Sequence, residues 1–464
     1  MREAEGLPVG RQATAPTGFG ILHGGFMAQQ RPFRFLHASN LHLGKPVGGV
    51  ADLPAHLRKR LVDAPRCAAL RFIDMALAEK VDFVVLSGGV IDCHQTGPWG
   101  PVFLVEQFKK LEKAGVAVYW ATGKSDFLER WPDELKLPQN VTVFSTSHVD
   151  EPLFQKDGFS VARILGISRS PERRRFRHSE FNPDSTGLFT IAVVSGKIDP
   201  QSLKNHGIDY WALGGITKRH TTYGNIITSV KTPERQVDLM PVKKVRQEFT
   251  RPSTVHYPGA MLARSFEQQG NYGVSLVIVD DKGKAAVSFL PTSPVRFVEE
   301  VIRMDSKAGV DQVREELRGR MIAHQGVQDN YDLMMSWKID GTQDLENRLR
   351  RTGILDQFRD ELRKDFGMDE LYAWTVSVKT AVPENFPPEY YEGETILGDY
   401  LQKIRQYQEG HIEIPTLESC LPKSGPTVPM KEQLVRIDPK LRDEFLRQVA
   451  ELGVDLLVRK EEKK

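Results

Sequence analysis

The chain has 464 residues and a mass of 52.4 kDa, enough for roughly two to four domains, and its 40% hydrophobic content excludes general disorder. Lys and Arg (63) nearly balance Asp and Glu (61), so the net charge of +2 excludes a global attraction to nucleic acid or anionic lipid. The three cysteines, Cys67, Cys93 and Cys420, form no CxxC pair, and no apolar run approaches the roughly 20 residues of a membrane span, so we expect a cytoplasmic protein without a membrane partner, a disulfide scaffold or a cysteine-rich zinc module.

Residues 1–30 are predicted to be a disordered tail. They are rich in Gly, Pro, Ala and Thr and lack the apolar core of a signal peptide. Met27 lies just before the first convincing strand, so a start of translation at Met27 in place of Met1 is a hypothesis that an intact mass of the native protein would decide.

Residues 31–295 are predicted to form an α/β domain. Strands at 35–38, 81–86 and 116–121 alternate with helices at 66–80 and 102–114, an order that implies parallel strands with right-handed crossovers. Strands with few helices follow, at 141–145, 160–168, 188–195, 209–213, 274–280 and 285–291. Two sheets flanked by helices would accommodate both halves.

Residues 296–382 are predicted to form a second, compact β-α-β-α-β unit. Its elements are strand 297–305, helix 309–323, strand 330–339, helix 342–365 and strand 370–380. A proline-rich linker begins at Pro383, and residues 383–464 then carry helices at 394–408 and 439–457.

Function in open α/β sheets gathers at the carboxyl ends of the strands. Those ends read HASNLH (37–42), GGVID (88–92), GKSD (123–126), VSG (194–196) and GGIT (214–217), and further on come DYWALG (209–214), YPG (257–259) and RSF (264–266). This series resembles the calcineurin-like metallophosphoesterases, in particular the SbcD-type DNA repair exonucleases and their YhaO-like bacterial relatives. Their blocks read DxH, GDxxD, GNHD, a lone His before Gly, and GHxH.

The resemblance covers residues 33–290 and implies a fold, a cofactor and partners. The fold is a four-layer α/β/β/α metallophosphoesterase sandwich, followed by a small α+β capping domain and a helical C-terminal tail. The family's cofactor is a pair of manganese ions that serve DNA cleavage. Its partners are DNA, a second copy of the chain, and a coiled-coil ATPase of the SbcC class bound through segments beyond the capping domain, where helices 394–408 and 439–457 lie.

The family's metal ligands are nearly all replaced in this sequence. Carried over block by block, the positions are occupied by Asn40, His42, Gly89, Lys124, Ser125, Ser195, Gly215 and Thr217, of which only His42 keeps the family residue. Two dications about 4 Å apart need anionic ligands between them, and the position of the bridging aspartate is Gly89. Ser125 replaces the catalytic histidine, so no acid is available for the leaving group. We therefore expect no metal cofactor and no catalytic residue.

Lys124 and the remaining acids allow alternative readings. The Lys124 ammonium would fill the vacated metal space and attract a phosphate, or would merely neutralise a leftover acid. Asp92 and Asp126 would cap a helix or pair with Lys124, or would form a rebuilt metal site with His42, His94 and His220 if these side chains converge.

A locally basic run is a candidate nucleic-acid contact. It comprises Arg173, Arg174, Arg175, Phe176 and Arg177, in which the cations could bind a nucleic-acid backbone and the ring could stack on a base. A solvated loop is the alternative.

The sequence therefore predicts a catalytically inactive homologue of an SbcD-type nuclease that acts by binding DNA or a partner ATPase. Two alternatives stay open: an active metal-dependent exonuclease or phosphoesterase with a rearranged metal site, and a structural interaction protein without DNA binding. The partner, the preferred DNA structure and the pathway cannot be identified from the sequence.

Overall fold

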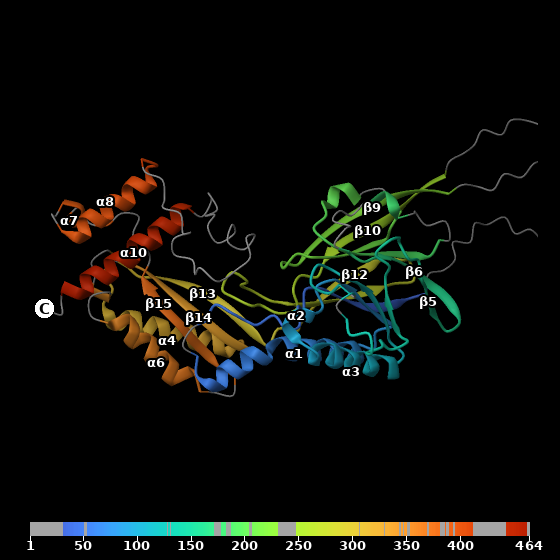
Figure 1. Cartoon of the computed structure of the whole chain (residues 1–464), viewed down its shortest axis with the longest axis horizontal. Coiled ribbons are helices and arrows are strands. Elements are labelled where there is room, and N and C mark those ends of the chain that lie inside the picture. Colours follow the sequence, from blue (N-terminus) through green and yellow to red (C-terminus); the bar gives the residue numbers. More distant parts are fainter. Residues whose placement is uncertain are drawn as a thin grey trace, which may run out of the picture.

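The computed structural model describes residues 31–50, 53–170, 178–181, 187–203, 207–230, 247–411 and 442–461. Single positions or short stretches are excluded within these ranges, at 128, 130, 306, 329, 343–344, 347, 350–352, 369–370, 381–385, 387–388 and 393–394. The described part is a mixed α/β fold with three sheets (Figure 1). No helix in it is long and apolar enough to cross a bilayer.

The first sheet has six strands in the order β12-β11-β1-β2-β3-β4. Their bounds are β1 Phe33–Ala38, β2 Phe83–Ser87, β3 Ala117–Ala121, β4 Val141–Val143, β11 Gly273–Val279 and β12 Ala285–Pro291. Strands β1 to β4 are parallel, and β11 and β12 complete the sheet antiparallel. Helices α1 (Ala55–Ala78) and α3 (Trp99–Lys113) pack on it through one apolar core, so the predicted strand–helix alternation is present.

The second sheet has the order β5-β6-β7-β8-β10-β9. Its strands are β5 Leu153–Lys156, β6 Phe159–Ile167, β7 Phe189–Ser195, β8 Tyr210–Gly214, β9 His220–Val230 and β10 Gln247–Tyr257. A core rich in aromatic residues lies between the two sheets, where the rings of Phe35 and Phe83 stack at 4.9 Å. The other face of the second sheet packs on residues near two 3-10 helices, His178–Glu180 and Pro200–Leu203.

The third sheet is a parallel three-stranded unit in the order β13-β14-β15. Strands β13 (Val295–Arg303), β14 (Asp332–Asp340) and β15 (Ala373–Thr380) alternate with α4 (Val310–Gly326) and α6 (Ile354–Phe366). Helices α4 and α6 share one core with the sheet, whereas Val295, Phe297 and Met334 belong to the core that contains α1. Helix α1 is therefore packed against both the first and the third sheet.

Two helices differ from their predicted bounds. The helix expected at 66–80 begins at Ala55 and continues through Pro65, because the buried side chains on both sides of the proline keep the helix packed on its sheet. The helix expected at 342–365 is interrupted, since Gly353 adopts φ 67°, a left-handed conformation that an α-helix cannot continue through, and α6 starts after it.

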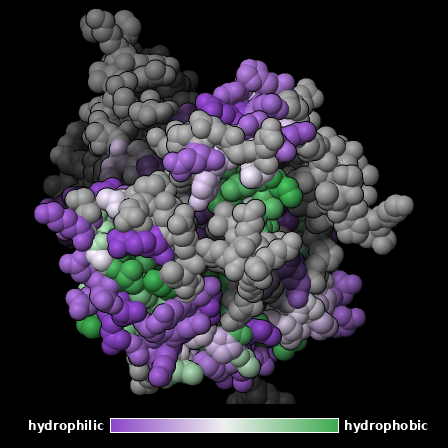
Figure 2. Space-filling view, turned by 90° about the vertical axis from the view of Figure 1, so that its left-hand side faces the viewer, coloured by the Kyte–Doolittle hydropathy of each residue, from purple (hydrophilic) through white to green (hydrophobic). Residues whose placement is uncertain are grey.

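The C-terminal helices α8 (Ile396–Gln408) and α10 (Arg442–Glu461) pack against each other and against α7 (Glu389–Glu392). The Tyr400 hydroxyl donates to the Val449 carbonyl at 2.6 Å. This end of the molecule is shown in Figure 2, where hydrophilic side chains cover most of the described surface and separate hydrophobic patches interrupt it. Ile396, Leu452 and Leu456 are among the exposed apolar side chains of these helices.

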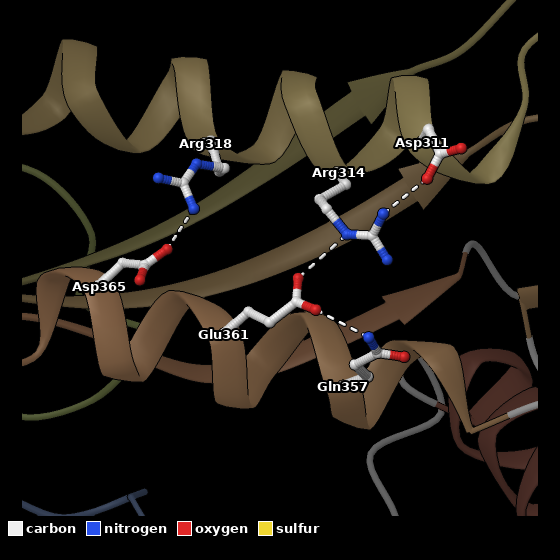
Figure 3. A network of polar contacts seen from close by, with 6 residues as sticks. All are labelled: Asp311, Arg314, Arg318, Gln357, Glu361 and Asp365. Carbon is white, nitrogen blue, oxygen red and sulfur yellow. Dashed lines mark hydrogen bonds and ion pairs between the residues drawn. The ribbon is translucent and has the colours of Figure 1, made fainter.

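A ladder of ion pairs joins α4 to α6 on their solvent side (Figure 3). Arg314 binds Asp311 at 2.6 Å within α4 and Glu361 of α6 at 3.1 Å, and Arg318 binds Asp365 one turn further along. The Gln357 amide donates to Glu361 at 2.8 Å. The two helices are thus joined by apolar side chains on the side that faces the sheet and by charged side chains on the side that faces solvent.

Candidate functional site

The carboxyl ends of the parallel strands bring most of the predicted site residues together. The loop after β1 hydrogen-bonds to the loop after β2, with Asn40 N to Gly88 O at 3.0 Å and His42 N to Gly89 O at 2.6 Å. In the second sheet the loops after β7 and β8 meet in the same way, with Gly196 N to Gly214 O at 3.1 Å. These contacts follow from the shared direction of the strands.

Asn40 ties the two sheets together. Its Nδ2 donates to the Ile216 carbonyl after β8 at 2.7 Å and to Ser39 Oγ at 3.2 Å, and the Ser39 hydroxyl donates to the Gly259 carbonyl at 2.9 Å. Asn40 is buried and has φ 53°, a left-handed conformation that asparagine tolerates better than most residues. The amide group acts here as a donor that braces the loops.

His42 is held in a neutral form. Its Nδ1 lies 3.2 Å from Ser125 Oγ, so two predicted site residues contact each other directly. Burial, followed by the charges of Arg264 and Lys45, lowers the pKa of His42 to about 4, with Asp92 acting weakly in the opposite direction. At neutral pH the imidazole is therefore uncharged and one ring nitrogen faces a hydroxyl.

The position of the family's bridging carboxylate is crowded and is occupied by a glycine. Gly89 has φ 70°, and a Cβ built there would lie 2.9 Å from Asn40 Oδ1 and 3.1 Å from His42 Cε1. Next to it, a Cβ on Gly88 would meet Ser195 Oγ at 2.2 Å, and one on Gly123 would meet the same oxygen at 2.8 Å. The strand ends are packed against one another.

Asp126 is the buried acid of the site, and neutral donors satisfy it. Its Oδ1 accepts from the backbone amides of Gly123 at 2.6 Å and Gly89 at 3.1 Å, and its Oδ2 accepts from Val90 N at 3.1 Å and Trp120 Nε1 at 3.0 Å. Burial raises the pKa of Asp126, and these hydrogen bonds oppose that rise. The carboxylate joins the loops after β2 and β3, and none of these four donors belongs to a helix start or to Lys124.

The other members of the hypothetical rebuilt site have separate partners. Asp92 Oδ1 accepts from Gln95 N at 3.3 Å at the start of the short helix α2 (Cys93–Thr96). His220 opens β9, where its Nε2 lies 3.0 Å from Thr222 Oγ1. The side chain of His94 lies outside the described residues. Among the side chains that the structure does describe, no group of three or more His, Cys, Asp or Glu residues could hold a metal ion.

The residues present do not fit a pair of divalent ions. Such a pair needs a bridging carboxylate and several further anionic or imidazole donors. Asn40 uses its amide nitrogen to hold a carbonyl, His42 has a hydroxyl group beside its Nδ1, and a side chain at Gly89 would press on both residues.

Basic side chains occur in several of the loops around the packed strand ends. The loops that follow β1, β3, β6, β7 and β8 each carry at least one basic side chain, and these include Lys45, Lys124, Arg169, Lys197 and Lys218. Lys124, Lys197 and Lys218 are exposed, as are Gly215 and Thr217 at the end of β8. Because the loops converge, these cations gather at one edge of the sheets, where the carboxylates of Asp92 and Asp199 also lie.

A buried polar network near the site was missed in the sequence. His37 Nε2 lies 2.9 Å from Ser87 Oγ and its Nδ1 lies 3.1 Å from the Tyr210 hydroxyl, whereas His256 Nε2 lies 2.7 Å from Ser275 Oγ. The two imidazole rings are 5.5 Å apart. The sequence did contain a sign of this network, because His37 is a polar residue within an otherwise largely apolar strand and a buried polar side chain requires a hydrogen-bond partner.

Arg264, the first residue of the RSF motif, has its guanidinium buried beside the His42 loop. Its Nη2 donates to the carbonyls of Leu41 and, at 3.3 Å, of His42, and its Nε has no hydrogen-bond partner among the described residues. Burial lowers the pKa of Arg264 to about 10. The basic run at 173–177, in contrast, lies outside the described residues.

Comparison with known proteins identifies one curated relative. The chain is 27% identical over 362 residues to the uncharacterised metallophosphoesterase YhaO of Bacillus subtilis (strain 168), a match that spans 73% of this chain and 79% of that protein. No protein-family model matches the chain. The relative supports the metallophosphoesterase resemblance that the strand-end blocks had indicated.

Proposed function

We propose that this chain is a metallophosphoesterase homologue that has lost its metal pair and binds nucleic-acid phosphates without cleaving them. The observation that supports this most is Gly89, which has no side chain and where a Cβ would lie 2.9 Å from Asn40 Oδ1 and 3.1 Å from His42 Cε1, so that a bridging carboxylate would require both residues to move. The cations of the converging loops replace the positive charge that metal ions would supply.

The proposal includes the finer architecture of the family. The two six-stranded sheets and their helices would form its four-layer α/β/β/α sandwich, residues 296–382 its DNA-capping domain and residues 383–464 its linker and tail. A cytoplasmic location, a homodimer, and an SbcC-type ATPase bound through α8 and α10 belong to the same proposal. Leu452 and Leu456, which are exposed and lie one turn apart on the same side of α10, support the last of these, because neighbouring exposed apolar side chains favour partner contacts.

DNA binding is tested by charge reversal at Lys124. A labelled duplex with free ends is titrated at several salt concentrations, and Lys124→Glu is compared with Lys109→Glu, an exposed lysine on α3 that is not part of the strand-end loops. We expect binding that weakens as salt rises, a loss of about tenfold for Lys124→Glu at low salt, and little loss for the control. Salt-independent or absent binding would favour an interaction protein without DNA binding.

Metal loss is tested separately by manganese calorimetry together with a nuclease assay. We expect no tight manganese site and no manganese-dependent cleavage of the same duplex. Two tight sites with cleavage would instead establish the active enzyme with a rearranged site, in which the undescribed His94 side chain would be the first residue to replace.

A further inference from the structure

A cavity of about 430 Å³ lies between helix α1 and the three-stranded sheet. Its volume falls within the roughly 300–1,000 Å³ of small-molecule sites. One wall is a face of α1, and the other is the chain at the amino-terminal ends of β13, β14 and β15. Figure 1 shows α1 reaching from the first sheet to the third. The cavity is separate from the strand-end site.

The wall contributed by α1 presents side chains at helical spacing. Arg60, Ala64, Cys67 and Arg71 follow one another at intervals of three and four residues, which places them on one side of the helix. Cys67 is a free, half-buried cysteine. The wall thus combines apolar surface, two guanidinium groups and one thiol.

The first of these guanidinium groups is committed to holding the cavity together. Arg60 Nη1 forms a 2.8 Å ion pair with Asp332 Oδ1, and the same oxygen accepts from Tyr372 N at 3.1 Å. The guanidinium also lies 4.5 Å from the centre of the Tyr372 ring. Arg60 and Asp332 neutralise each other, so they fix the two walls without giving the cavity a net charge.

The second guanidinium hydrogen-bonds to neutral groups, although its charge also acts to lower the pKa of Asp332. Arg71 donates to the carbonyls of Ser293, at 3.0 Å, and Asn330. Lys59 also lines the cavity, with Asp63 one turn further along the helix. Apart from the Arg60–Asp332 pair, two cations therefore face one carboxylate, and the balance favours an anionic ligand.

The remaining lining is apolar. Leu61, Leu70, Val295 and Leu371 contribute to it, together with Tyr331, whose ring is covered by Arg296 at 3.9 Å. Covering the apolar or aromatic body of a ligand with this wall would remove apolar surface from water and so favour binding. Inorganic phosphate alone would leave this wall unused.

We propose that the cavity binds a small organic anion with an apolar or aromatic body, about the size of a nucleoside monophosphate, with its anionic group at Arg71 and Lys59. A ligand in this position contacts α1 and the starts of all three strands at once. Its binding would therefore stabilise the packing of the third sheet against α1.

Cys67 provides a reporter in the intact chain. The protein is treated with N-ethylmaleimide with and without AMP, and modification is quantified by peptide mass spectrometry at Cys67 and, as an internal control, at the half-buried Cys93 in α2. We expect AMP to slow modification of Cys67 at least fivefold and to leave Cys93 unchanged. Calorimetry with AMP measures the same binding independently of thiol reactivity.

Three variants and one control test the chemistry. Arg71→Gln should weaken AMP binding about tenfold and Lys59→Gln a few-fold, because each removes a charged donor. Leu70→Trp keeps every charge but fills the cavity, and should abolish binding. The matched control is Arg58→Gln, which removes an exposed cation of α1 that does not line the cavity, and should leave binding unchanged.

The outcomes separate the parts of the proposal. Adenosine binding as tightly as AMP would overturn the anionic requirement, and inorganic phosphate binding as tightly would overturn the role of the apolar wall. Absence of both calorimetric heat and Cys67 protection at millimolar AMP, benzoate and indole-3-acetate would overturn the site itself. A preference for the carboxylates over AMP would support the site and identify the anionic group as a carboxylate.

Discussion

The strand-end site and the α4–α6 ladder both depend on carboxylates, but they hold them in opposite surroundings. Asp126 is 1% exposed, and every partner that holds it is a neutral N–H group. Glu361 is 36% exposed at its side chain and is paired with Arg314, itself 33% exposed. A buried acid must have each acceptor satisfied, whereas an exposed pair competes with water and salt. Replacing these two acids should therefore have very different costs.

The largest effect is expected from Asp126→Asn. The new amide nitrogen would face backbone or indole N–H groups, so at least one buried donor pair would be left without an acceptor. We expect a loss of about 3 kcal/mol or more in the free energy of unfolding, measured by urea titration with tryptophan fluorescence. A loss below about 1 kcal/mol would show that the carboxylate is not what holds the loops together.

Acid should destabilise the packing between the two large sheets. Burial is the main cause that lowers the pKa of His256 to about 3, and burial together with the charge of His256 holds the pKa of His37 well below its ordinary value. The unfolded chain, with pKa values near 6.5, then binds more protons below that pH. We expect the free energy of unfolding to be fully present above pH 6.5 and these two histidines to lower it by up to about 2.7 kcal/mol per pH unit on acidification, with His42, whose pKa is also lowered, adding about 1.4 kcal/mol per pH unit.

His256→Gln tests the origin of this acid sensitivity. Glutamine keeps hydrogen-bonding capacity towards Ser275 but does not titrate, so the slope below pH 6.5 should become shallower by about 1.4 kcal/mol per pH unit. His411→Gln, at a side chain that is 70% exposed, serves as the control. An unchanged slope in the His256 variant would assign the acid sensitivity to other groups.

Substituting two glycines of nearly equal φ angle distinguishes the cost of backbone strain from the cost of crowding by neighbouring atoms. Gly89 has φ 70° and Gly115 has φ 73°, but a Cβ on Gly115 would meet nothing within 4 Å. Gly115→Ala should therefore cost about 1 kcal/mol of unfolding free energy from strain alone, and Gly89→Ala about 2–3 kcal/mol. Equal costs in urea unfolding would mean that the strand ends can spread to accept a side chain, and would weaken the case against a bridging carboxylate.

The smallest effect is expected from the ladder. A double-mutant cycle with Arg314→Ala and Glu361→Ala should give a coupling energy of about 0.5 kcal/mol that decreases as salt is raised. The measurement is thermal or urea unfolding of the two single variants and the double variant. A coupling above about 2 kcal/mol would show that these exposed charges behave as a buried pair.

The sequence predicts those contacts of the site that depend only on the order of the strands. Asn40, His42 and Gly89 follow neighbouring parallel strands, so motif order was enough to bring them together. The four donors around Asp126 could not be predicted, because their convergence depends on the conformation of two loops. His37 and His256 are 219 residues apart in the printed sequence, and only the packing of two sheets makes them neighbours.

The cavity beside α1 was beyond prediction for the same reason. Its walls come from one helix and from the starts of three strands more than 200 residues later, and helix periodicity does not show which side of α1 a distant sheet covers. The resemblance also did not indicate it, since every block that carries the resemblance lies at strand ends or in the segments that follow them. The cavity is formed by long-range packing, so local sequence patterns could not predict it.

The placement of α1 between two sheets has a consequence for the order of folding during synthesis. Arg60 and Asp332, which pair across this seam, are separated by 272 positions. At roughly 5–20 residues per second, the ribosome would need about 15–55 s to make the second partner after the first. During that interval the first sheet can assemble on one side of α1 while the side destined for the third sheet stays open to water and to chaperones. The seam between α1 and the third sheet is therefore among the last parts of the molecule to close.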